Sequence, residues 1–181
     1  MTPTLLVVSG LPASGKTQLG MQLAAHLHWP NVTKDDYKQI LHEGLPDLTN
    51  AQSGPLSFRL MYHVAGVTLA AGINTVLETH FYLGLGEKNI QALAQAHGAR
   101  LVQIFCHAPL DELARRHAAR VASGLRPHID HASLDHYNLP AHCCHTPLDL
   151  AAPLLRVDTT QPVEVAAIAD WVRSAAWSPV D

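Results

Sequence analysis

The segment that most constrains this chain is Gly10–Thr17, which follows the pattern G-x-x-x-x-G-K-[ST]. A short apolar run, Leu5–Val8, precedes it, and three leucines at helical spacing (Leu19, Leu23 and Leu27) follow it. Such an apolar run is typical of a buried parallel strand, and the leucine spacing indicates a helix. The segment is therefore expected to form a glycine-rich loop between a strand and a helix, which is the setting in which this pattern binds phosphate.

A loop of this kind surrounds polyphosphate with backbone N–H groups and with the positive end of the following helix. Lys16 is expected to reach the β- and γ-phosphates, and the Thr17 hydroxyl is expected to ligate Mg²⁺. The chain is therefore predicted to bind ATP together with Mg²⁺. The residues predicted to hold the nucleotide are Gly10, Pro12, Ala13, Ser14, Gly15, Lys16, Thr17 and Gln18.

Strand-like and helix-like stretches alternate along the 181 residues. Beyond the loop, strands are expected near Val32, at 73–78, at 100–106 and at 154–158. Residues 44–57 are rich in Gly, Pro, Asp, Asn and Ser, so they predict a loop before the next helix. This order predicts an α/β fold, with a parallel five-stranded sheet flanked by helices on both faces, in a single domain of residues 1–181.

Polar residues follow the predicted strands, where ligands of parallel sheets collect. Asp35 and Asp36 come after the second strand, and Glu78 ends the third. One of the two aspartates is also expected to cap the helix that follows them. All three carboxylates are therefore expected to share one cleft with the glycine loop.

Half of the eight arginines fall within twelve residues of each other, between 115 and 126. Arg116 and Arg120 are four residues apart on a predicted helix, so they share a face that could point into the cleft. The planar guanidinium group binds phosphate oxygens in pairs, which suits the charge of a transferred phosphoryl group. A solvated basic helix surface is the alternative interpretation.

These features together resemble the small P-loop kinases, a family that includes phage-type polynucleotide kinase, zeta toxins, gluconate kinase and chloramphenicol phosphotransferase. The resemblance rests on Gly10–Thr17, Lys34–Gln39, Leu77–Thr79 and the pair Arg116 and Arg120, in family order along almost the whole chain. It implies a fold like that of nucleoside monophosphate kinases. It also implies transfer of the γ-phosphate of ATP to a hydroxyl group.

The resemblance also implies roles for individual residues. Asp35 matches the family's carboxylate that orients the acceptor hydroxyl and takes its proton, with Asp36 as the alternative. The arginines match a lid, expected at about 115–147. Glu78 matches a Walker-B-type carboxylate, often Asp in relatives, and either contact with Mg²⁺ or orientation of the acceptor stays open. The predicted catalytic residues are Lys16, Asp35, Arg116 and Arg120, and the predicted metal residues are Thr17 and Glu78.

Charge bears on the identity of the acceptor. A net charge of −3 with only four lysines is poorly suited to gripping a nucleic acid backbone, so a small molecule is favoured. The match of Lys34–Gln39 to polynucleotide kinase favours a 5′-hydroxyl polynucleotide instead. A third alternative is an ATP-binding regulatory or toxin-like module with no acceptor.

The stretch 128–145 carries five of the thirteen histidines together with Cys143 and Cys144. Zinc is an alternative there, but adjacent cysteines chelate one ion poorly, so a histidine-rich lid is preferred. Three cysteines suggest no disulfide framework, and no segment approaches the ~20 apolar residues of a membrane span. Without a leader-like start, the expected location is the cytoplasm, and the oligomeric state stays open.

Overall fold

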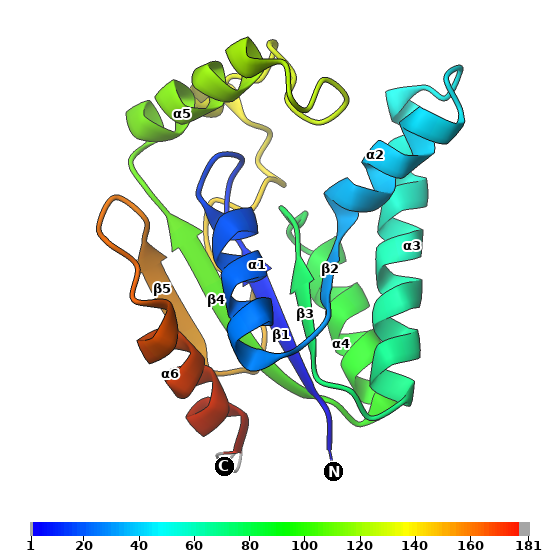
Figure 1. Cartoon of the computed structure of the whole chain (residues 1–181), viewed down its shortest axis with the longest axis vertical. Coiled ribbons are helices and arrows are strands. Elements are labelled where there is room, and N and C mark those ends of the chain that lie inside the picture. The colour runs from blue at the N-terminus through cyan, green and yellow to red at the C-terminus, as the bar shows by residue number, and fades with distance from the viewer. Residues whose placement is uncertain (1, 178–181) are drawn as a thin grey trace.

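A five-stranded parallel sheet runs through the middle of the structure, in the strand order β2-β3-β1-β4-β5 (Figure 1). The computed structural model describes residues 2–177. This topology confirms the α/β fold and the parallel five-stranded sheet that the sequence predicts. The strands are β1 (Thr4–Ser9), β2 (Asn31–Thr33), β3 (Thr75–Glu78), β4 (Arg100–His107) and β5 (Leu154–Asp158).

Helices cover both faces of the sheet (Figure 1). Because successive side chains of a strand point to opposite faces, Leu6 and Val8 of β1 pack with α1 and α6, whereas Leu5 and Val7 pack with α3 and α4. None of the helices within residues 2–177 is both long and apolar enough to cross a membrane. The helices are α1 (Lys16–Leu27), α2 (Lys34–Gly44), α3 (Asn50–Ala70), α4 (Leu85–His97), α5 (Leu110–Ser123) and α6 (Val165–Trp177).

The loop predicted at 44–57 is wrong over most of its length, because α3 already begins at Asn50. Thr49 and Gln52 form a capping box, in which the Thr49 N–H donates to Gln52 Oε1 over 3.0 Å. The buried hydroxyl of Ser53 is hydrogen-bonded to His42 of α2 at 2.9 Å. Capping and packing against α2 therefore outweigh the low helix propensity of this Gly- and Pro-containing stretch.

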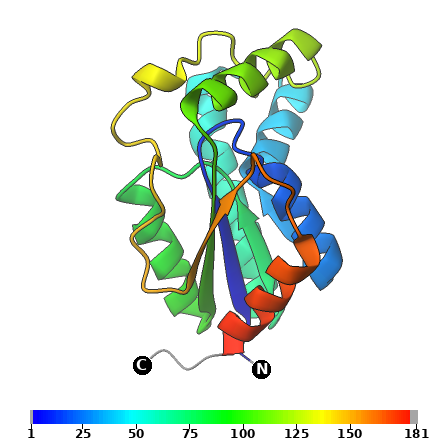
Figure 2. The same ribbon diagram turned by 90° about the vertical axis from the view of Figure 1, so that its left-hand side faces the viewer.

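The chain between α5 and β5 contains only one short 3₁₀ helix, η1 (His136–Asn138). Figure 2 shows α5 lying across the carboxyl ends of the strands, and the following segment descending on the α4 side toward the start of β5. Leu148 and Leu150 of this segment join the apolar core beneath it. The irregular segment is therefore anchored at its far end while its first part covers the edge where ligands of such sheets bind.

Candidate functional site

The glycine loop Gly10–Thr17 joins β1 to α1 in a turn that two of its glycines make geometrically feasible. Gly15 has a φ of +82°, a left-handed conformation that favours glycine. A Cβ atom at Gly10 would lie 2.3 Å from the Cys106 carbonyl oxygen of β4, so no larger residue fits there. The loop can therefore lie tightly against the sheet and point α1 toward the ligand edge.

The polar side chains of this loop are buried. Lys16, the first residue of α1, donates from Nζ to the Leu11 carbonyl oxygen over 3.3 Å. The Ser14 hydroxyl is fully buried and has no hydrogen-bond partner among the described residues. The loop thus holds a cation and a hydroxyl at the N-terminal end of a helix, which is the arrangement that binds phosphate.

A cavity of about 980 Å³ opens beside the loop, between α1, α5 and the residues after β5. Five of the eight predicted nucleotide residues line it, and Gly10 and Ser14 are buried within the turn. Pro12 instead lines a second cavity. The lining residues that come from the loop and its helix start are Ala13, Gly15, Lys16, Thr17 and Gln18.

Thr17 and Glu78 meet beside this cavity. The Thr17 hydroxyl donates to Glu78 Oε1 over 3.2 Å, and Glu78 Oε2 is buried without a hydrogen-bond partner among the described residues. Burial raises the pKa of the Glu78 carboxyl, although the positive charge of Lys16 opposes the shift. Oxygen ligands from a hydroxyl and a carboxylate suit Mg²⁺, which usually takes one or two protein ligands and completes its shell with phosphates and water.

No group of three or more His, Cys, Asp or Glu side chains within residues 2–177 is arranged to hold a metal ion. The histidine- and cysteine-rich stretch instead makes structural contacts. The buried Cys144 thiol donates to the Thr146 carbonyl oxygen over 2.8 Å, and Cys143 forms an isolated β-bridge with Tyr82.

The second cavity has a volume of about 370 Å³ and adjoins the first. Lys16, Thr17 and Arg120 line both cavities, so the two spaces meet at the loop lysine. The second cavity is strongly polar. Its charged and histidine lining includes Lys34, Asp35, Lys38, His80, Arg126 and Asp130.

Asp35 is held between two cations in the second cavity. Its Oδ1 lies 3.3 Å from Lys34 Nζ, and its Oδ2 lies 2.9 Å from an Arg126 guanidinium nitrogen. Burial by itself raises the pKa of the carboxyl, but the charges of Lys34, Lys16 and Arg126 outweigh it and hold the pKa at about 2. Asp35 is therefore ionised at neutral pH.

Asp36 is placed differently from its neighbour. It is exposed and lies outside the lining of the second cavity. The expectation that an aspartate caps α2 is wrong, because Thr33 occupies the cap position and both aspartates lie in the first helical turn. Acidic side chains in a first turn still interact favourably with the helix dipole.

Arg116 and Arg120 share one face of α5, as their spacing predicts, but they have different partners. Arg116 donates to the hydroxyl and carbonyl oxygens of Thr159, both over 2.9 Å, and to Glu112 over 2.6 Å. Arg120 pairs with the buried Asp130 at 2.9 Å and lines both cavities. Arg120 thus lies where the cavities meet, whereas Arg116 is fastened to the segment after β5.

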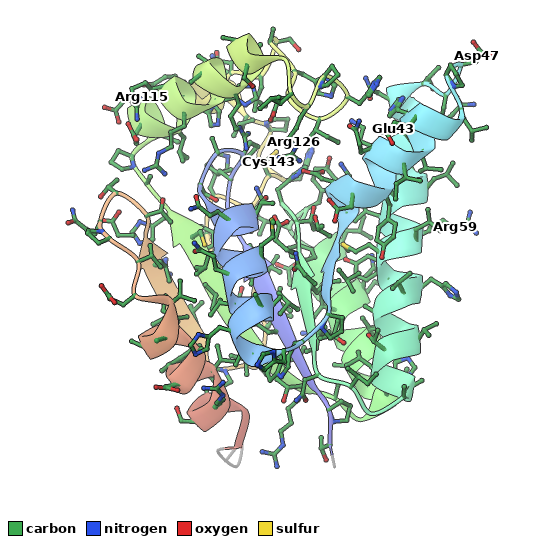
Figure 3. All side chains as sticks on the ribbon, in the orientation of Figure 1. Glu43, Asp47, Arg59, Arg115, Arg126 and Cys143 are labelled. Carbon is green, nitrogen blue, oxygen red and sulfur yellow. The ribbon has the colours of Figure 1, made fainter. Side chains whose placement is uncertain are left out.

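Arg126 was not among the predicted site residues, although it belongs to the arginine-rich stretch. Figure 3 shows it reaching from the segment after α5 toward the start of α2, whereas Arg115 points away from the molecule. Its contact with Asp35 joins residues 91 positions apart. No local pattern signals such a pair, since only the folded chain brings the two residues together.

Histidines fasten the segment after α5 to the glycine loop. The buried His136 donates from Nε2 to the Pro12 carbonyl oxygen over 3.0 Å, and its ring lies edge-on to His117 at 5.4 Å. His117 donates to the His131 carbonyl oxygen over 2.9 Å, and its other ring nitrogen lies 3.4 Å from Arg120. These histidines therefore act here as hydrogen-bonding groups within the protein.

The parallel sheet in the order β2-β3-β1-β4-β5, with the glycine loop between β1 and α1, is the fold of the P-loop kinases. The profile of the AAA domain family (AAA_33) matches residues 5–139. Because the match covers most of the chain, the chain belongs to this family of small P-loop kinases.

Solved structures agree with this assignment. A candidate kinase from Chloroflexus aurantiacus J-10-fl is 33% identical, with a TM-score of 0.87, over 97% of this chain and 99% of that chain. The Mycobacterium tuberculosis APS kinase CysC in complex with AMPPNP and APS is 19% identical, with a TM-score of 0.65, over 98% of this chain and 99% of that chain. A gluconokinase from Sinorhizobium meliloti 1021 is 20% identical, with a TM-score of 0.51, over 96% of this chain and 93% of that chain. At 19% and 20% identity, the APS kinase and the gluconokinase show only that the fold is shared. Comparison with curated proteins gave no match.

His80, which lines the second cavity, is expected to have a pKa far below the usual value for histidine. Burial lowers the pKa of His80 from 6.5 to about 3, and the nearby charges of Lys16 and Lys34 add to the shift. Because the folded protein favours the neutral ring, the stability that depends on His80 is complete above pH 6.5 and declines as the pH falls below that value. We expect the wild type to lose more stability between pH 7 and pH 5 than His80→Gln, measured by urea unfolding. The exposed His63 on α3 gives the matched control, His63→Gln, which should follow the wild type.

Proposed function

We propose that this chain transfers the γ-phosphate of ATP, with Mg²⁺, to a hydroxyl group of a small-molecule acceptor. The observation that carries the proposal is the shared lining of the two cavities by Lys16, Thr17 and Arg120. The first cavity contains the phosphate-binding loop, and the second contains the ionised carboxylate of Asp35. The γ-phosphate of ATP in the first cavity and the hydroxyl group of an acceptor in the second can therefore meet at Lys16.

Phosphoryl transfer asks an enzyme mainly to position its substrates and to balance charge. Lys16 and the loop N–H groups would bind the donor phosphates. Arg120 would face the charge that develops on the transferred group, and Arg116 would clamp the donor from its anchor on Thr159. Thr17 and Glu78 would hold Mg²⁺, which supplies charge neutralisation at the β- and γ-phosphate oxygens.

Asp35 would orient the acceptor hydroxyl. With a pKa of about 2, it is a weak base, so it suits a loose transition state in which the hydroxyl proton leaves late. Lys34 and Arg126 already pair with its two oxygens, and these contacts fix the carboxylate in one orientation. The acceptor hydroxyl would then donate to a remaining lone pair of the carboxylate.

We further propose that residues of about 115–147 form the lid of a single kinase domain. Its contacts with the rest of the site would include those of His136 with Pro12, Arg126 with Asp35 and Arg116 with Thr159. Closure over the cavities would exclude water and so limit hydrolysis of ATP without transfer.

The proposal is tested by the release of ADP in the presence of candidate alcohols. We expect at least one small alcohol to raise ADP release above the rate with water alone, in a reaction that requires Mg²⁺. A rate raised only by 5′-hydroxyl oligonucleotides would support a polynucleotide kinase instead. If no acceptor raises the rate, the chain is better described as an ATP-binding regulatory module.

Asp35→Asn should lower transfer by about 10²- to 10⁴-fold and leave ATP affinity nearly intact, because the amide cannot accept the hydroxyl proton. Steady-state kinetics with the acceptor and equilibrium binding of ATP measure the two effects. Asp36→Asn is the matched control and should retain transfer, since Asp36 lies outside the cavity. Retained transfer in Asp35→Asn, or an equal loss of transfer and ATP affinity, would remove Asp35 from the role.

Glu78→Gln should raise the Mg²⁺ concentration needed for half-maximal activity by about 10- to 100-fold, because it removes the charge beside Thr17. Activity measured against Mg²⁺ concentration checks this effect, and the exposed Glu43→Gln serves as the control. An unchanged Mg²⁺ dependence combined with a higher KM for the acceptor would assign Glu78 to the acceptor instead of the metal.

A further inference from the structure

A third cavity, of about 420 Å³, adjoins the second and has no part in the transfer described above. It lies between α3 and the residues from Phe81 to the first turns of α4. Lys34, Asn50, Gly54 and Tyr82 line both the second and the third cavity. The two spaces therefore lie side by side, within reach of one elongated ligand.

Aromatic side chains are concentrated in the third cavity. The whole chain has three Phe, four Tyr and three Trp, and four of these residues, Phe58, Tyr62, Phe81 and Tyr82, line this one space. The ring centroids of Phe58 and Tyr82 lie 5.8 Å apart at a tilt of 45°. Both residues are only half-buried, so parts of their surfaces remain available to a ligand. Tilted and offset ring contacts are the ones that aromatic groups prefer.

The polar lining of the third cavity is uncharged except at its border with the second. Burial raises the pKa of the Tyr62 phenol to about 12, so this group is neutral at physiological pH. Asn50 and Asn89 supply amide donors and acceptors. The one charged residue of the lining is Lys34, whose Nζ lies 5.7 Å from the Phe58 ring centroid and 3.3 Å from Asp35. The lining thus changes from aromatic to ionic at Lys34.

Gly54 stands where the two cavities join. It lies inside α3, where glycine costs about 1 kcal/mol relative to alanine. Its backbone is outside the left-handed region, and an added Cβ would meet nothing within 4 Å. Neither conformation nor packing therefore requires glycine, whereas a side chain at this position would enter the open space between the cavities.

We propose that the third cavity binds an aromatic ring of the acceptor, so that the acceptor is a small alcohol with an aromatic or heteroaromatic group. This inference rests on the proposed kinase function. The ring packs against Phe58, Tyr62 and Tyr82, and the two asparagines hydrogen-bond its polar substituents. The chain linking ring and hydroxyl passes Gly54, and the hydroxyl reaches Asp35. Nucleosides and simple aryl alcohols share this chemistry.

The test compares kcat/KM for three sets of acceptors: aryl-substituted diols, unphosphorylated nucleosides, and aliphatic diols with the same number of hydroxyl groups. We expect the aryl diols or the nucleosides to exceed the aliphatic set by about tenfold or more, which is the effect of some 1.4 kcal/mol of ring contact. The set with the higher value identifies the kind of ring.

Gly54→Leu should lower this preference for ring-bearing acceptors about tenfold, because the added side chain fills the passage. Gly44→Leu is the matched control, since Gly44 ends α2, has open space around it and lines neither cavity. Thermal unfolding of both variants verifies that they fold, and Gly54→Ala gives a smaller side chain at the same site.

Two results would overturn the ring site alone, and one would overturn the kinase function together with it. Aliphatic diols that are phosphorylated as well as their aryl counterparts would leave the kinase function standing and remove the ring site. An unchanged preference in folded Gly54→Leu would do the same. If no alcohol of any set is phosphorylated, the proposed function fails and the ring site fails with it.

Discussion

The close approach of the glycine loop to β4 is the constraint on which the rest of the site depends. Gly10 lies so near the Cys106 carbonyl oxygen that a Cβ atom has no room, and Gly15 turns the chain through a left-handed conformation into α1. Lys16 therefore begins a helix at the carboxyl edge of the sheet, facing both cavities. Every other group of the proposed mechanism is positioned relative to this lysine.

Long-range polar contacts complete the site around that loop. Arg126 reaches Asp35, Arg116 reaches Thr159, and His136 reaches the Pro12 carbonyl oxygen. Each contact joins the region of the proposed lid to a different part of the sheet edge. Because several of these groups are charged or buried, they are costly to leave unpaired, and their pairing favours one arrangement of the lid over the cavities. The contacts that stabilise this arrangement are therefore the same ones that would position the substrates in the proposed mechanism.

The residues that the sequence points to are those whose chemistry follows from local order. The loop pattern, the carboxylates at strand ends and the arginine spacing each depend on a few neighbouring residues, and the structure brings Lys16, Asp35 and Arg120 to one cavity. The start of α3 at Asn50 does not follow from local propensity, because the capping box of Thr49 and Gln52 stabilises the first turn although Gly54 and Pro55 follow. The contact between Arg126 and Asp35 has no signal in the local sequence, because the two residues are 91 positions apart.

Local patterns in the chain were therefore enough to define the fold class, the phosphate loop and the order of the strands along the chain. Tertiary structure alone decided that Asp36 lies outside the second cavity, that Arg126 reaches Asp35, and that four scarce aromatic residues gather around the third cavity. The physical reason is distance along the chain. A loop or a cap is stabilised by neighbours in sequence, whereas a cavity is built by side chains from separate elements that meet only when the sheet and its helices pack.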